Sequence, residues 1–99
     1  MKAKINYHFS NKIWRHHLAG GWYFISLPSN LSKEIRQQLQ WQEEGWGRMK
    51  ATAQVNWSSW DTAIWFDKKH NTYLLPLKAD IRKKAGLQLG DRVEVTISG

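Results

Sequence analysis

Residues 75–95 read LPLKADIRKKAGLQLGDRVEV and contain the clearest helix and strand patterns in the chain. After Pro76, apolar residues recur at a spacing of four: Leu77, Ile81 and Ala85. This spacing is helical, and Gly86 is placed to end the helix. Beyond the turn at Gly90-Asp91, apolar and polar residues alternate, which predicts a strand over 92–98 with one face in a core.

The same order of features occurs earlier in the chain, which predicts an internal repeat. Leu27-Pro28 precede a second set of apolar residues at a spacing of four: Leu31, Ile35 and Leu39. We interpret Leu27-Pro28 as the counterpart of Leu75-Pro76, and Arg36 as the counterpart of Arg82. Ser29 or Asn30 is the expected N-cap of this first helix. Two such units predict one barrel with pseudo-two-fold symmetry, because closure removes exposed strand edges.

Further strands complete the predicted sheet. Residues 2–9 and 48–56 alternate cleanly between apolar and polar side chains. Residues 12–17 are expected to continue the first strand after a bulge near Ser10-Asn11. Three more segments are predicted as strands with weaker patterns: 22–27, 60–66 and 72–75. Two of these, 22–27 and 60–66, carry aromatic residues at both parities, so we expect them to be buried on both faces. The prediction is a mainly β fold, a closed six-stranded barrel with two short helices.

Length and composition exclude several classes of protein. The 99 residues predict a single domain over 1–99. Without cysteine, the chain has neither a disulfide framework nor a thiolate metal site. The longest apolar run, Trp22 to Ile25, is far shorter than the ~20 residues of a transmembrane helix. It is also too short for a signal peptide. We therefore expect a soluble cytoplasmic protein that does not bind a membrane.

The chain is strongly basic, with 15 Lys and Arg against 8 Asp and Glu and a net charge of +7. Such an excess favours binding to polyanions, nucleic acid among them. The alternative interpretation is that scattered lysines only increase solubility.

A set of ordered motifs resembles the bacterial domain-of-unknown-function family numbered nineteen-oh-five. The residues that carry the resemblance run through nearly the whole chain: Trp22–Pro28, Gly45-Trp46-Gly47, Trp60–Ile64, Asp67-Lys68, Tyr73–Lys78, Arg82 and Gly90–Val95. The resemblance implies a small closed β-barrel of the double-split type. It also implies a possible protein partner, because family members stand alone or precede an OmpD-associated, bacteriocin-protection-like domain. That second domain is absent from this sequence.

Residues 75–95 are also similar to the half-barrel of AbrB-type swapped-hairpin transcription factors and antitoxins. In those proteins two chains complete one DNA-binding barrel. Here the internal repeat supplies both halves, so we expect a monomer.

The sequence predicts no catalytic residues, metal site or cofactor. His16 and His17 are adjacent, so on a strand they point to opposite faces and cannot share an ion. Asp61 and Asp67 share a face of one candidate strand, but about 20 Å separates them, too far for paired acid–base chemistry. No nucleophile elbow or phosphate-binding glycine loop occurs.

Two sets of side chains are the candidate sites. The basic set is centred on the second predicted helix, where Lys78 and Arg82 share a face, and it is predicted to bind anions or nucleic acid: Lys78, Arg82, Lys83, Lys84, Arg36, Lys68 and Lys69. The aromatic set is predicted to line a pocket at the barrel mouth with Lys78: Trp46, Trp60, Thr62 and Tyr73.

The chain has seven tryptophans, and we assign them two roles. Trp22, Trp46 and Trp60 are expected to fill the core. Trp41 and Trp57 have polar neighbours in predicted loops and are the candidates for exposed stacking surfaces.

Three hypotheses for function follow. The first is a non-catalytic binding module for an anionic partner, with nucleic acid as the leading candidate. The second is a small-molecule pocket at the barrel mouth, with or without catalysis. The third is a partner domain for an OmpD-associated protein.

Overall fold

The computed structural model describes residues 6–16, 22–45 and 47–98. The elements follow one another in this order: β1 (Asn6–Arg15), β2 (Tyr23–Ser26), α1 (Ser29–Leu39), a 3-10 turn η1 (Gln40–Gln42), β3 (Arg48–Val55), β4 (Ser58–Asp67), β5 (Thr72–Pro76), α2 (Ala79–Ala85) and β6 (Arg92–Ser98).

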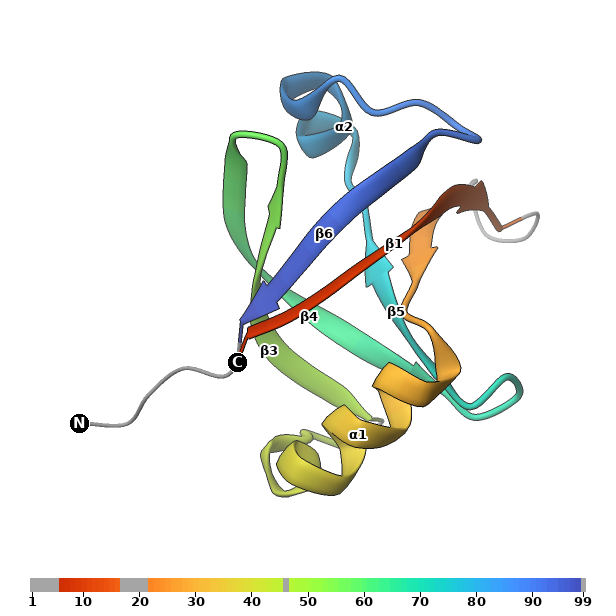
Figure 1. Ribbon diagram of the computed structural model, residues 1–99, viewed down its shortest axis with the longest axis vertical. Coiled ribbons are helices and arrows are strands. Elements are labelled where there is room, and N and C mark those ends of the chain that lie inside the picture. The colour runs from red at the N-terminus through yellow and green to blue at the C-terminus, as the bar shows by residue number, and fades with distance from the viewer. Residues whose placement is uncertain (1–5, 17–21, 46, 99) are drawn as a thin grey trace.

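The six strands form a closed antiparallel barrel in the order β1-β2-β5-β4-β3-β6 (Figure 1). The long strands β1 and β4, of ten residues each, cross the molecule and pair with a different neighbour along each part of their length. Figure 1 shows α1 and α2 at opposite ends of this barrel. The predicted closed six-stranded barrel with two helices is confirmed.

The ring has the predicted pseudo-two-fold symmetry. Exchanging β1 with β4, β2 with β5 and β3 with β6 returns the same cyclic order. The axis passes through the seam between β2 and β5, where Ile25 lies opposite Leu75. Around this pair, Leu27 N donates to Tyr73 O and Leu77 N donates to Tyr23 O, each at 2.9 Å. Sequence numbers that differ by 50 are therefore equivalent across the seam.

This equivalence corrects the predicted alignment of the two repeats. Leu27 matches Leu77 and not Leu75, so the two prolines do not correspond. Arg82 then corresponds to Ser32, and Arg36 is not its counterpart. Both Ser32 and Arg82 donate their N–H to the residue four before them, at 2.8 and 3.0 Å.

The helices end differently from one another. Pro28 occupies the N-cap position of α1 without a side-chain hydrogen bond, so the predicted Ser29 or Asn30 cap is wrong. Helix α1 buries Ser32, Ile35 and Leu39. Helix α2 ends at Gly86, whose φ of 68° is a left-handed conformation that glycine adopts without strain, as predicted. None of its own residues is fully buried.

Strand β1 continues without the predicted bulge. Its pairing with β6 is regular from Asn6 to Lys12, and inward positions alternate without a break. Asn11 takes one of these inward positions. Its Nδ2 donates to Ser26 O at 2.9 Å, and its Oδ1 accepts from the N–H of Lys12 at 2.9 Å. A polar side chain thus closes the point where β1 and β2 diverge.

One cluster of side chains fills the barrel, with Ile25, Leu27 and Leu75 wholly buried. Trp60 is partly buried and packs against this cluster. Trp22 is 50% exposed, so its predicted place in the core is wrong. The predicted burial of residues 22–27 on both faces is also wrong. Strand β2, which lies within this segment, has only one fully buried residue, Ile25. Trp46 lies outside the described residues.

Candidate functional site

Strands β4 and β5 separate where Pro76 ends the ladder between them. Their pairing covers three residue pairs and stops at Leu74. Tyr73 O faces β2, where it accepts from Leu27 N. Backbone groups alternate along a strand, so Leu74 and Pro76 face β4. The next hydrogen-bonded pair would join Ala63 to Pro76, but proline has no N–H to donate.

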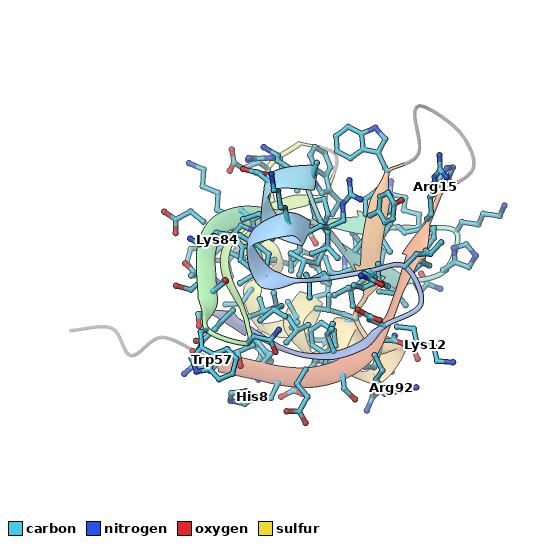
Figure 2. The ribbon with its side chains drawn as sticks, turned by 90° about the horizontal axis from the view of Figure 1, so that it is seen from above. His8, Lys12, Arg15, Trp57, Lys84 and Arg92 are labelled. Atoms are coloured by element: carbon cyan, nitrogen blue, oxygen red, sulfur yellow. The ribbon has the colours of Figure 1, made fainter. Side chains whose placement is uncertain are left out.

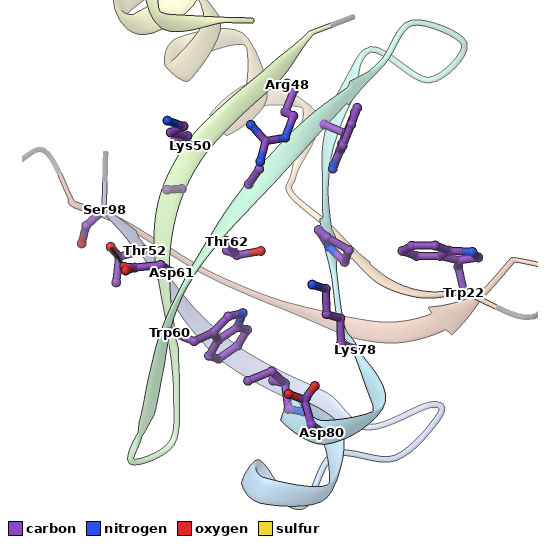
Figure 3. A pocket seen from close by; sticks show the side chains of 15 residues that line it. Trp22, Arg48, Lys50, Thr52, Trp60, Asp61, Thr62, Lys78, Asp80 and Ser98 are labelled. Atoms are coloured by element: carbon purple, nitrogen blue, oxygen red, sulfur yellow. Dashed lines mark hydrogen bonds between the residues drawn. The ribbon is translucent and has the colours of Figure 1, made fainter.

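An open groove of about 810 Å³ begins at this separation and runs between β4 and α2 (Figure 3). Ala63 lines one bank, and Pro76 and Ile81 line the other. In Figure 3, Trp60 lies toward the start of α2, Thr62 projects from β4 into the groove, and Lys78 extends from the opposite bank. The predicted pocket residues Trp60, Thr62 and Lys78 therefore line one groove, two of them from β4 and Lys78 from the segment before α2.

Three indoles line the groove: Trp60 and Trp65 from β4, and Trp22 from the residue just before β2. Trp22 stacks on Phe24 with ring centroids 6.3 Å apart and an interplanar angle of 14°. Trp65 is 40% exposed, and Cζ of Arg48 lies 5.8 Å from its ring centroid. Trp22 and Trp65 are each in contact with one neighbouring side chain and partly exposed, so they offer flat surfaces to a ligand.

Charged side chains surround these rings. Lys50 and Lys78 are both exposed, and neither makes an ion pair with any described residue. The third cation, Arg48, pairs with Glu44 at 3.4 Å. Two carboxylates, Asp61 and Asp80, also line the groove. Asp61 Oδ1 accepts a hydrogen bond from Thr52 Oγ1 at 3.2 Å.

Tyr73 does not line the groove, which corrects its predicted role as a pocket residue. Its side chain is wholly buried, and its hydroxyl donates a short hydrogen bond to Glu43. Burial raises the pKa of Tyr73 well above 10, and the hydrogen bond to Glu43 raises it further. Arg36 Nε lies 3.5 Å from the same Glu43 oxygen, and its guanidinium lies over Phe66 with Cζ 3.9 Å from the ring centroid.

The predicted basic surface is divided between the two ends of the barrel. Arg36 belongs to α1, and the turn that holds Lys68 and Lys69 lies at the same end of the barrel (Figure 1). Lys83 and Lys84 are exposed on α2 at the other end. In Figure 2, the exposed cations are spread around the molecule. The basic set is therefore not one patch.

Arg82 is engaged by the fold rather than presented to solvent. Its Cζ lies 3.6 Å from the ring centroid of Tyr23, and its Nε donates to Leu77 O at 3.2 Å. Lys78 precedes the first residue of α2, and its side chain lines the groove. The two cations that were predicted to share a helix face thus have different surroundings.

The two tryptophans predicted to be exposed are exposed, at 73% for Trp41 and 99% for Trp57. Trp41 Nε1 donates to Gln38 O at 3.1 Å. Trp57 is in the turn between β3 and β4, and it is near the edge of the molecule in Figure 2. Asn56 ties this turn to α2 through a hydrogen bond from its Nδ2 to Ala85 O at 3.2 Å. Whether either indole stacks on a ligand stays a prediction.

The groove residues that sequence reasoning missed include two tryptophans and two cations: Trp22, Trp65, Arg48 and Lys50. The alternation of β3 carried a signal for two of them, because Arg48 and Lys50 occupy its outward positions. The sequence around Trp22 and Trp65 contains no signal that they line a groove. Both residues reach the groove because β4 and β5 separate beside them.

The described residues contain neither a membrane-spanning helix nor a cluster of metal ligands. No helix among them is long and apolar enough to span a membrane. No group of three or more His, Asp or Glu side chains within these ranges could hold a metal ion.

A family model described as Domain of unknown function (DUF1905) matches residues 9–97. No curated protein sequence matches the chain.

Proposed function

The chain belongs to this DUF1905 family, whose description assigns no activity, and we propose that it is a non-catalytic module that binds an anionic partner in the groove between β4 and α2. The observation that carries this proposal is the convergence of three indoles and two unpaired lysines where the barrel opens. A ligand site needs such a concave surface with a few placed polar groups.

The charges support an anionic partner. Lys50 and Lys78 lie on different elements and have no ion partner among the described residues, so an incoming anion can pair with both. The net charge of +7 adds long-range attraction that raises the rate of encounter.

The polar lining of the groove supports binding rather than catalysis. The exposed carboxylate of Asp61 is engaged by a hydrogen bond from Thr52. The described residues that line the groove include no histidine to act as an acid or base near neutral pH.

A small planar anion is the second candidate. The volume of about 810 Å³ lies within the range of about 300–1,000 Å³ typical of small-molecule sites. Trp22 and Trp65 would then stack on its ring.

The test is a titration with three labelled polyanions: single-stranded RNA, duplex DNA and poly-glutamate. Fluorescence anisotropy is measured at about 50 and 200 mM salt, because phosphate contacts give a steep salt dependence. The groove variant carries Lys50→Ala and Lys78→Ala. The control carries Lys83→Ala and Lys84→Ala, which removes the same charge from exposed positions of α2 outside the groove.

We expect at least one polyanion to bind, and we expect the groove variant to bind it about tenfold more weakly, a loss of ~1.4 kcal/mol. The control variant should lose about threefold or less. Equal losses in both variants would make the attraction diffuse and overturn the assignment to the groove. If no polyanion binds at the lower salt, a polyanionic partner is excluded, and the small-ligand alternative is tested with a metabolite library.

A further inference from the structure

Strand β4 has an unpaired edge along the groove. Phe66 N donates to Gly47 O at 3.0 Å, so the backbone of Phe66 faces β3. Successive residues of a strand point their N–H and C=O groups to opposite sides. Three residues therefore turn these groups to the groove: Ser59, Asp61 and Ala63.

No ladder joins these residues to β5, because the pairing begins only after them, at Trp65. Within the described residues, neither Ser59 nor Asp61 makes a backbone hydrogen bond to the segment that follows β5. No described side chain donates to or accepts from the backbone of these two residues or of Ala63. A row of free donors and acceptors is a template for pairing with another strand.

The edge of β1, which the pseudo-two-fold axis relates to the edge of β4, is closed by side chains. Where β1 leaves β2, Asn11 bridges the divergence by bonding to Ser26 O and Lys12 N. Tyr7 OH then donates to Gln38 Oε1 at 2.8 Å and connects β1 to α1. Neither kind of bridge occurs at the described part of the β4 edge.

We propose that the edge of β4 accepts an extended, acidic segment of a partner protein as an added strand. This inference rests on the proposed function, because it names the class of anionic partner that the groove binds. The added strand would lie between β4 and the Pro76–Ile81 bank, with its backbone bonded to Asp61 and Ala63.

The chemistry of the edge favours a polypeptide over a nucleic acid. A peptide offers N–H and C=O groups at the same two-residue period as β4, so donors meet acceptors. A phosphate backbone offers only acceptors, which cannot pair with the C=O groups of the edge. The carboxylates of Asp61 and Asp80 also repel closely spaced phosphates, whereas a peptide can place its acids only beside Lys50 and Lys78.

The first measurement is hydrogen exchange by NMR on the free protein. Amides of Trp60, Thr62 and Ile64, which face β3, should exchange slowly. Amides of Asp61 and Ala63 should exchange at least about tenfold faster. Slow exchange at both residues would mean that the edge is already paired and would overturn the proposal.

The second measurement is a selection of a random peptide library on the immobilised full chain. We expect enrichment of acidic sequences with alternating apolar residues, and protection of the Asp61 and Ala63 amides when an enriched peptide is added. No enrichment, or binding that leaves both amides fast, would overturn strand addition.

Two substitutions at one position separate the backbone from the side chain. Asp61→Pro removes an N–H that does not pair with β3, and an edge strand tolerates proline there. Asp61→Ala removes the carboxylate and keeps the N–H. Selected peptides should bind Asp61→Pro at least about tenfold more weakly than the parent, and Asp61→Ala somewhat more tightly.

Equal binding to the parent and to a folded Asp61→Pro variant would overturn the inference. If Asp61→Pro does not fold, amide protection in the parent protein decides the question. If acidic peptides fail but nucleic acid binds and depends on Lys50 and Lys78, the proposed function holds and strand addition fails. If neither ligand binds, both are wrong.

Discussion

Asn11 shows how one residue decides whether two strands separate with an open or a closed edge. It occupies an inward position of β1, where the alternation predicts an apolar side chain, and its amide replaces the backbone pairing that β1 and β2 lose. Asn11→Ala leaves Ser26 O and Lys12 N without these partners. We expect a loss of about 1–2 kcal/mol in the free energy of unfolding, measured by urea denaturation.

The control for this prediction is Gln54→Ala, an exposed position on β3. It should change the free energy of unfolding by less than about 0.5 kcal/mol. If Asn11→Ala costs no more than the control, water replaces both hydrogen bonds and the amide does not stabilise the split.

Tyr73 carries a buried hydroxyl whose proton the folded state retains. Burial and the hydrogen bond to Glu43 raise its pKa, while an unfolded tyrosine titrates near 10.0. A raised pKa gives stability that is complete below pH 10 and is lost as the pH rises toward the folded-state value. The free energy of unfolding should therefore fall above about pH 10, by up to ~1.4 kcal/mol per pH unit for this group.

Tyr73→Phe tests this account. At neutral pH it should cost about 1–3 kcal/mol, because the half-enclosed Glu43 carboxylate loses a donor. Between about pH 9 and 11, the variant should lose less stability than the parent. Burial also raises the pKa of Tyr7, so the free energy of unfolding still decreases with pH in both proteins because of this second tyrosine. Identical slopes in urea titrations would exclude Tyr73 as the group responsible.

At the residue scale, the sequence predicted burial correctly for some aromatic residues and wrongly for others. The exposure of Trp41 and Trp57 followed from their polar neighbours. Trp22, predicted to be in the core, is half exposed, and Tyr73, predicted to line a pocket, is wholly buried. Both predictions failed because apolar character does not indicate which side of a segment meets the core. Only the pairing of β2 with β5 settles that question.

At the scale of elements, two glycines test how the turns hold the strands and helices together. Gly86 ends α2 with φ 68°, and a Cβ there would meet nothing within 4 Å. Gly47, just before β3, has φ 84°, and a Cβ would lie 3.1 Å from Phe66 Cβ. Gly86→Ala should therefore cost only the strain of the left-handed conformation, about 1–2 kcal/mol.

Gly47→Ala should cost clearly more than Gly86→Ala, because Phe66 must also move away from the packed core. Urea denaturation compares the two variants directly. Gly86→Asn serves as the control, since asparagine tolerates this conformation better than alanine. Equal costs at the two glycines would mean that β4 yields to the added methyl group.

The order of the elements was predictable, but the opening between them was not. Helical spacing and alternation gave the helices and strands, because these periods follow from local geometry. The role of Pro76 depends on its register with Ala63 on another strand, and register is not visible in a single segment. The groove and the β4 edge could not be predicted either, because both depend on the register between β4 and β5.

At the scale of the whole molecule, net charge predicted an anionic partner without indicating where it binds. The barrel carries α1 and α2 to opposite ends, which separates Arg36 from Lys83 and Lys84. Arg36 and Arg82 are then held over aromatic rings. The cations available to a ligand in the groove are Lys50 and Lys78, the first of which the sequence did not single out.

The pseudo-two-fold axis passes through the seam between β2 and β5, one of the places where the two halves of the barrel meet. Ile25 and Leu75 lie opposite each other there, both wholly buried. Ile25→Val should cost about 0.5–1.5 kcal/mol and Leu75→Ala about 2–5 kcal/mol. Since each side chain packs against the other, we expect the double variant to depart from additivity by about 0.5 kcal/mol or more. The matched cycle combines Leu75→Ala with Ile97→Val, a buried residue on β6, which does not pair with β5. If both cycles are additive, Ile25 and Leu75 do not stabilise each other across the seam.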